Sequence, residues 1–155
     1  MQTLISLFLS ACLSAALYQF IAPRFSRGAV AFQPVSLGYK LLFGVALSTV
    51  SQVVLMGLTL LASVTLVPLL AIFGAATSSA TPTAAVLALS VVLLVTLLQL
   101  ANWVATMTLG RLMPTIIRVD SASAAFKAAL APTLVTGVLY VVMVFALAPM
   151  MAVPS

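Results

Sequence analysis

The sequence is poor in ionisable side chains: its 155 residues include no histidine, one acidic residue and six basic residues. The acid, Asp120, lies outside every long apolar run. General acid–base catalysis needs positioned groups of this kind, and a serine or cysteine nucleophile needs a neighbouring base to activate it. We therefore expect that the chain is not an enzyme and that it has no catalytic residues.

Patterns that bind metals, cofactors or nucleic acid are also missing. The single cysteine, Cys12, has neither a histidine nor a second cysteine to complete a common zinc site. No glycine-rich phosphate-binding motif is present. The basic residues that give the net charge of +5 form no continuous run, so nucleic acid is not an expected partner. The sequence predicts no metal-binding residues and no cofactor.

Apolar residues, in contrast, make up 65% of the chain, and charged residues only 5%. A soluble domain usually carries about 25% charged residues, because its surface faces water. Crossing the hydrocarbon core of a bilayer takes roughly 20 apolar residues, and the sequence has four such runs, at about residues 1–22, 41–67, 84–110 and 129–148. The predicted fold is all-α: a polytopic membrane protein with a four-transmembrane-helix bundle, in a single transmembrane domain of residues 1–155.

The six basic residues fall into two groups, one after the first apolar run and one after the third. Because basic residues near span ends favour the cytoplasmic side, both groups are predicted to be cytoplasmic and both chain termini to lie outside. Tyr18 and Trp103 lie toward the same ends, where aromatic rings prefer the level of the lipid headgroups. Contact with anionic lipid headgroups is expected from Arg24, Arg27, Lys40, Arg111, Arg118 and Lys127.

The two halves of the chain resemble each other when the sequence is shifted by 87 residues. We interpret the match as two duplicated helical hairpins, residues 1–74 and 75–155, related by an axis along the membrane normal. The alternative is that any two helical hairpins with cytoplasmic basic loops share this pattern. The segments at residues 36–40 and 121–127 are predicted to form short interfacial helices, each with a serine as its N-cap. The matching positions include Arg24 with Arg111, Ser36 with Ser123, Tyr39 with Phe126 and Lys40 with Lys127.

Each apolar run also carries a stripe of small or polar residues, which helices use to associate in lipid. Gln52 lies 11 residues after Leu41, and Gln99 lies 11 residues before Gly110. Both counts start at a cytoplasmic end, so the two amides are predicted to lie at similar depth, to face the same interior and to be within hydrogen-bonding reach. Structural packing is the first interpretation, and a polar permeation or substrate site is the alternative. The predicted polar packing residues are Ser48, Gln52, Gln99, Asn102 and Thr136, with Ser10, Ser14, Ser51 and Thr133 on the same stripes.

Three functions are compatible with these patterns. The first expectation is a non-catalytic integral membrane subunit that contributes structure or assembly to a larger membrane protein complex, with other membrane subunits as partners. The alternative is a small channel or facilitator, in one form a dimer, that uses the amides of Gln52, Gln99 and Asn102. The third is a lipid- or pigment-contacting module. The alanine-, leucine- and valine-rich composition without a cleaved leader favours a bacterial inner membrane, with the mitochondrial inner membrane as the alternative.

Overall fold

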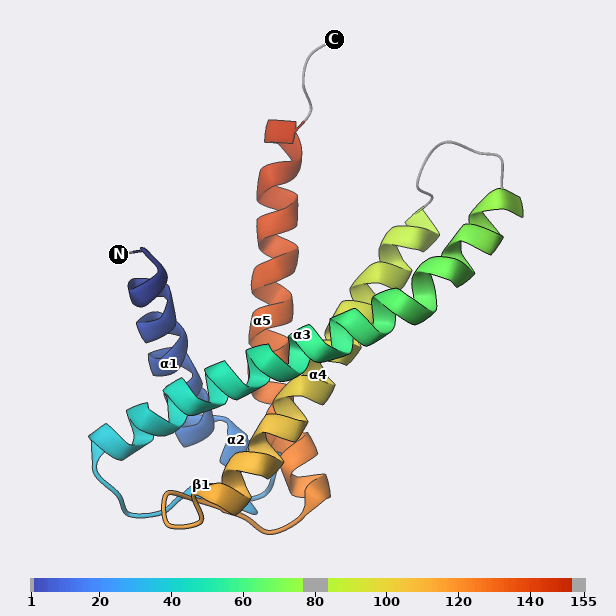
Figure 1. Cartoon of the computed structure of the whole chain (residues 1–155). Coiled ribbons are helices and arrows are strands. Elements are labelled where there is room, and N and C mark those ends of the chain that lie inside the picture. The colour runs from blue at the N-terminus through green and yellow to red at the C-terminus, as the bar shows by residue number, and fades with distance from the viewer. Residues whose placement is uncertain (1, 77–83, 152–155) are drawn as a thin grey trace.

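The computed structural model is mostly helical and describes residues 2–76 and 84–151, with side chains described for residues 8–64, 91–139 and 142 (Figure 1). Helices suit a chain of this composition because, in lipid, a helix satisfies its backbone polar groups within itself. The elements, in chain order, are α1 (Gln2–Phe20), α2 (Ala22–Phe25), β1 (Val30–Phe32), α3 (Leu37–Ala76), α4 (Ala84–Leu112), β2 (Ile117–Val119) and α5 (Ala122–Met151).

Three helices of the described part are long and apolar enough to cross a membrane, which agrees with the expected transmembrane character. Their qualifying segments are Leu37–Val64 in α3, Val91–Leu112 in α4 and Ala122–Leu139 in α5. The run expected at residues 1–22 contains α1 and ends at the first residue of α2, and the side chains of its first seven residues lie outside the described part. Within the connection expected at residues 68–83, α3 continues to Ala76 and residues 77–83 lie outside the described residues.

Helix α3 differs from its predicted end before Pro68, because it passes through this proline and ends at Ala76. A proline removes only one backbone hydrogen bond of the helix, and membrane helices tolerate it. The predicted interfacial helices also differ from the structure. Residues 36–40 and 121–127 are not separate helices. Apart from Ser36 and Ser121, which lie just before α3 and α5, these residues belong to the first turns of the two helices. Ser121 is the N-cap of α5, where its Oγ accepts a hydrogen bond of 3.1 Å from the backbone N–H of Ala124.

A two-stranded antiparallel sheet joins the two connections that carry the basic residues, and it is an addition to the predicted all-α fold. Val30 pairs with Val119, Ala31 with Arg118, and Phe32 with Ile117. The ladder extends by one hydrogen bond at each end, from Gln33 N–H to the carbonyl of Ile116 (2.9 Å) and from Asp120 N–H to the carbonyl of Ala29 (3.0 Å). Strands of three residues are too short to produce the alternation of apolar and polar residues that predicts a strand.

The hydrophobic core of the described residues lies around this sheet, at what we call the basic end: the loops of residues 21–36 and 113–121 with the helix ends that they join. Val30 and Ile117 are fully buried between the helices. The ring of Phe43 makes edge-to-face contacts with Tyr18 and Phe32, with centroids 5.5 and 5.2 Å apart. Such contacts and burial hold the loops against the helices.

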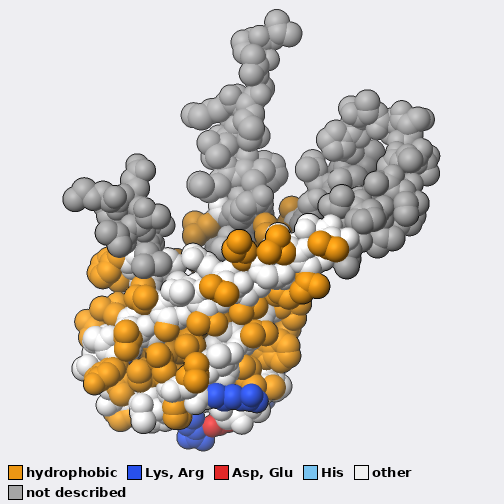
Figure 2. All heavy atoms as spheres, viewed as in Figure 1, with side chains coloured by type: hydrophobic (Ala, Val, Ile, Leu, Met, Phe, Trp, Pro, Cys, Tyr) orange, Lys and Arg blue, Asp and Glu red, His pale blue; other side chains and the backbone are white. Residues whose placement is uncertain are grey.

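From the basic end, α1 packs against α3, α3 against α4, and α4 against α5. Away from it the helices diverge: Figure 1 shows α1, α5 and the α3–α4 pair pointing in three different directions. Figure 2 shows the Lys, Arg and acidic side chains at the basic end, whereas hydrophobic side chains cover much of the described face above them. The long helices are therefore joined at one end and spread at the other.

Candidate functional site

A small polar pocket lies among α1, α3, α4 and α5, and it is the candidate functional site. Its volume is about 230 Å³. A water molecule takes roughly 30 Å³ in the liquid, so the pocket has room for several waters or for one small solute. Its polar lining comprises Ser10 and Ser14 of α1, Ser48, Ser51 and Gln52 of α3, Asn102 of α4 and Thr136 of α5, and its apolar lining comprises Leu47, Leu55, Leu98 and Pro132.

Gly44 brings α1 and α3 close enough for their serines to meet. A Cβ atom at Gly44 would lie 2.2 Å from the carbonyl oxygen of Ala11, so only glycine allows this approach. One turn further along α3, the hydroxyl of Ser48 lies 3.1 Å from that of Ser10 and 3.3 Å from that of Ser14. Two hydrogen bonds among three hydroxyl groups use two of their three protons. One proton is therefore left for a partner in the pocket or elsewhere.

A directed chain of hydrogen bonds crosses from α3 through α4 to α5. The hydroxyl of Ser51 donates to Oδ1 of Asn102 over 2.7 Å, and Nδ2 of Asn102 donates to Oγ1 of Thr133 over 3.0 Å. Thr133 in turn donates to the carbonyl of Ala129 over 2.9 Å. This series of hydrogen bonds uses both the oxygen and the nitrogen of the Asn102 amide, and it orients the oxygen toward α3 and the nitrogen toward α5. The packing role expected for Asn102 therefore has a specific geometry, in which one side chain connects three helices.

Gln52 and Gln99 do not meet, in contrast to the prediction. Gln52 is exposed, lines the pocket and has no hydrogen-bond partner among the described residues. Gln99 is buried and is not part of the pocket lining, because its Nε2 donates to the carbonyl of Phe126 in α5 over 2.8 Å. Its Oε1 is buried without a partner in the described part. The two amides therefore lie in different surroundings, since Gln99 is bonded to α5 whereas Gln52 lines the pocket.

Tyr18 connects the pocket to the basic end, and sequence reasoning missed this role. The residue is fully buried within the protein, and its hydroxyl is hydrogen-bonded to Oγ1 of Thr106. Because Thr106 donates its own proton to the carbonyl of Asn102 (2.7 Å), Tyr18 is the donor to Thr106. The signal that could have revealed the bond is the threonine one turn after Asn102, which offers a hydrogen-bond partner to a buried phenol.

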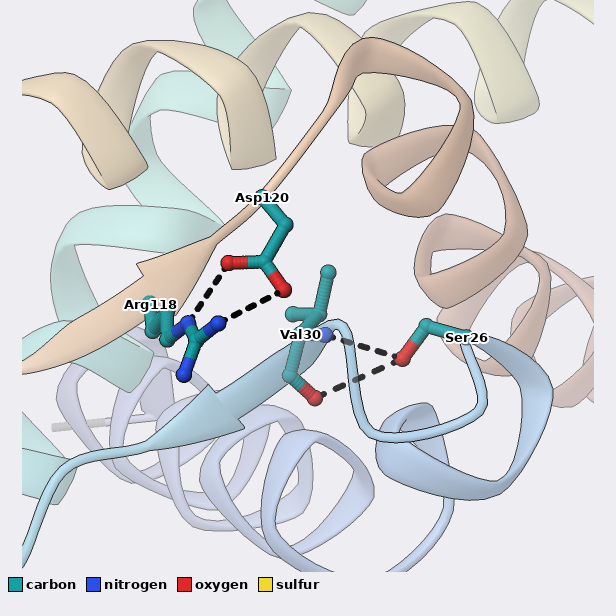
Figure 3. A network of polar contacts seen from close by, with 4 residues as sticks. All are labelled: Ser26, Val30, Arg118 and Asp120. Atoms are coloured by element: carbon teal, nitrogen blue, oxygen red, sulfur yellow. Dashed lines mark hydrogen bonds and ion pairs between the residues drawn. The ribbon is translucent and has the colours of Figure 1, made fainter.

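Of the six expected lipid-contacting residues, five are exposed and one is half-buried. The half-buried one is Lys40, whose Nζ lies 5.8 Å from the centre of the Phe32 ring. Arg118 donates from Nε (2.6 Å) and from Nη2 (3.2 Å) to the two carboxylate oxygens of Asp120 (Figure 3). These hydrogen bonds raise the pKa of the Arg118 guanidinium above its ordinary value. The exposed residues are Arg24, Arg27, Arg111, Arg118 and Lys127.

The turn that leads from α2 into β1 is held by a buried serine. The Oγ of Ser26 donates to the carbonyl of Ala22 over 2.9 Å. It also accepts from the N–H of Val30 over 3.0 Å and lies 3.4 Å from the carbonyl oxygen of Val30 (Figure 3). Two residues between Ser26 and Val30 have positive φ angles, 55° at Arg27 and 80° at Gly28. This left-handed backbone is unusual for a residue with a side chain, so the Ser26 bonds help to hold Arg27 in it. The turn places Arg27 on the surface and Val30 in the core.

Metal-binding chemistry is not found in the described part of the chain, where no three His, Cys, Asp or Glu side chains lie close enough to hold an ion. The site therefore consists of neutral hydroxyl and amide groups, which can bind uncharged polar molecules or polar side chains but have no acid or base to offer. Comparisons with protein-family models, with curated proteins and with solved structures find no match for this chain.

Proposed function

We propose that this chain is a non-catalytic subunit of a larger membrane protein complex, in which it contributes structure or assembly. It crosses the membrane four times, with α1 as the additional span beside α3, α4 and α5. The basic end is cytoplasmic and the termini lie outside, in a bacterial inner membrane. The distribution of charge supports this orientation, because the described basic side chains gather at one end of the helices (Figure 2).

The observation that carries the proposal is the amide of Gln52, which has no hydrogen-bond partner in the described part of the chain. This residue lies near the middle of the apolar segment Leu37–Val64, so it lies deep in the bilayer if the segment spans it. Moving an amide from water into hydrocarbon without a hydrogen bond costs about 4 to 8 kcal/mol. The neighbouring exposed residue Thr49 avoids this cost, because its hydroxyl donates to the carbonyl of Val45 in its own helix (2.9 Å). Gln52 has no such bond, and a polar side chain on a partner helix would supply one.

The length and direction of α3 support the same proposal. Its 40 residues correspond to about 60 Å of helix, twice the roughly 30 Å of a hydrocarbon core. The helix must therefore tilt strongly or extend beyond the core, and packing against neighbouring helices is what sets tilt. Because α1, α5 and the α3–α4 pair diverge (Figure 1), neighbours for the spread ends would come from other subunits.

The test compares Gln52→Leu with Thr49→Val in the native membrane. After extraction in a mild detergent, the wild-type chain should migrate on a native gel as part of a heteromeric complex. Gln52→Leu should release the chain from the complex, whereas Thr49→Val should not, because it removes a hydroxyl that is satisfied within α3. Migration of the wild-type chain as a monomer or small homo-oligomer would contradict the proposal.

A facilitator of small uncharged polar solutes is the second candidate, and the pocket is the observation that favours it. Two helical hairpins, α1–α3 and α4–α5, both contribute to its lining. The sheet adds to the argument for duplication, since Ala31 pairs with Arg118, a residue 87 positions later, and this is the shift that aligns the two halves. In transporters built from repeats, substrate sites lie near the midplane at the interface between the repeats.

Solute uptake by proteoliposomes separates the two candidates. A facilitator should speed the entry of a small neutral solute such as glycerol or urea, and Gln52→Leu and Ser48→Val should each slow it. Thr49→Val is again the matched control, because Thr49 does not line the pocket. Uptake equal to that of empty liposomes would exclude the facilitator but would leave the subunit proposal intact.

A further inference from the structure

A second pocket lies on the surface of α4 near the basic end, and its lining is unlike that of the polar pocket. It is an open groove of about 410 Å³, lined by Trp103, Val104, Met107, Thr108, Arg111 and Leu112. These positions recur at one-turn intervals along one side of α4, so the groove follows the helix axis. From Trp103 to Arg111 it extends over eight residues, or about 12 Å.

Arg111 is the polar group of the groove that still needs a partner. The hydroxyl of Thr108 already donates to the carbonyl of Val104 (2.8 Å), and the indole N–H of Trp103 already donates to the carbonyl of Ala122 (2.9 Å). The guanidinium of Arg111 is exposed and has no ion pair in the described part of the chain, where Asp120 is bound by Arg118. The groove therefore offers an apolar surface with one free cation at its basic end.

The wall of the groove is held in place by the start of α5. Besides its hydrogen bond to Ala122, the indole of Trp103 makes an edge-to-face contact with the Phe126 ring, with centroids 6.0 Å apart. A tryptophan fixed in this way has a defined position at the membrane interface, where such rings are favoured. The groove thus has one rigid aromatic side, which distinguishes it from a general lipid-facing surface.

We infer that this groove binds one phospholipid with an anionic headgroup. The headgroup phosphate pairs with Arg111, and the upper part of one acyl chain lies along Val104 and Met107 beside the indole of Trp103. Charge and polarity fit this occupant: a cation lies at the headgroup end and apolar side chains lie below it. The inference rests on the proposed membrane embedding with the basic end at an interface, and it does not depend on a partner subunit.

The first half of the chain provides a matched control at Arg24, the position aligned with Arg111. Arg24 lies in the short helix α2 (Ala22–Phe25), which begins after Ile21 and contains Pro23. Arg24 does not line the groove beside α4. Arg24→Gln and Arg111→Gln therefore remove the same charge from the same end of the molecule, but only the second removes it from the groove.

The experiment uses the full chain in mild detergent, mixed with phosphatidylglycerol or with phosphatidylcholine, and counts retained lipids by native mass spectrometry. The wild-type chain should retain one phosphatidylglycerol in preference to phosphatidylcholine. Arg111→Gln should lower this occupancy about fivefold, which is the contribution of one basic residue at a membrane surface. Arg24→Gln should leave it unchanged. Val104→Phe, which fills the groove, should also lower it, whereas Val53→Phe on the exposed side of α3 should not.

Three results would overturn the inference: equal loss in the two arginine variants, equal retention of the two lipids, or full occupancy in Val104→Phe. Size-exclusion chromatography shows whether each variant remains folded, and Arg111→Gln alters no hydrogen bond of the described structure. Native-gel migration reports the complex and mass spectrometry reports the lipid. Failure of the lipid site can therefore be told apart from failure of the proposed subunit function.

Discussion

A single methyl group added at Gly44 should force α1 away from α3. In Gly44→Ala the new Cβ would lie 2.2 Å from the carbonyl oxygen of Ala11 and 3.3 Å from the Cβ of Ala15. The nearest atom belongs to the backbone of α1, so no side-chain rotation can relieve the contact. To restore an ordinary van der Waals distance of about 3.4 Å, the two helices must separate locally by about 1 Å.

The energetic cost has two parts. Inserting a methyl group into a well-packed contact costs about 1 to 3 kcal/mol. The separation also lengthens the contacts of Ser48 with Ser10 and Ser14, now 3.1 and 3.3 Å, beyond hydrogen-bonding distance. Each interhelical hydrogen bond in a membrane contributes about 0.6 kcal/mol. The free energy of unfolding should therefore fall by about 2 to 4 kcal/mol in total.

Titration with sodium dodecyl sulfate in mixed micelles can measure this change, followed through the fluorescence of Trp103, the single tryptophan of the chain. The matched control is Gly57→Ala in the same helix, where a Cβ would meet no atom within 4 Å. This control should unfold at the wild-type detergent concentration or slightly above it, because alanine is the better helix former. If both variants unfold at the same concentration, the close approach at Gly44 does not stabilise the bundle and the reasoning fails.

Three further predictions use the same titration. Asn102→Leu should lower the free energy of unfolding by about 1 to 2 kcal/mol, because it leaves both of its hydroxyl partners without their shared amide; an unchanged value would show that the hydrogen-bond chain contributes nothing. Ser121→Ala should cost about 1 kcal/mol through the lost N-cap, whereas Ser123→Ala, with no bond to lose, should cost nothing measurable. Asp120→Asn should leave stability unchanged, since its pair with Arg118 is exposed; a large loss would mean that the sheet depends on this pair.

The long helices could be predicted from the sequence because the signal is compositional and extends over many residues. A run such as Leu37–Val64 can be recognised as a candidate membrane-spanning helix from its length and apolarity alone. The positions of Ser48, Asn102 and Thr136 around one pocket also follow the stripes expected on the helices. In each case a local pattern is enough, since polar groups in a membrane bundle must find partners in the interior.

The sheet and the placement of the amides depend on contacts that no local pattern contains. Val30–Phe32 and Ile117–Val119 are short, and each becomes a strand only because the other lies beside it. Gln52 and Gln99 were expected to meet because equal depth was assumed from equal residue counts. In the structure Gln99 donates to the carbonyl of Phe126 in α5 while Gln52 lines the pocket, and both placements depend on how the helices pack together.

The pairing of β1 with β2 has a consequence for the order of biosynthesis. Ala31 leaves the ribosome 87 residues before its partner Arg118, a wait of roughly 4 to 17 s at 5 to 20 residues per second. During that time the backbone of β1 has no strand partner. The ladder, and with it the burial of Val30 and Ile117, can form only after α4 and β2 have emerged. Closure of the basic end is thus a late step, and a chain truncated before Ile117 would keep β1 open to proteases.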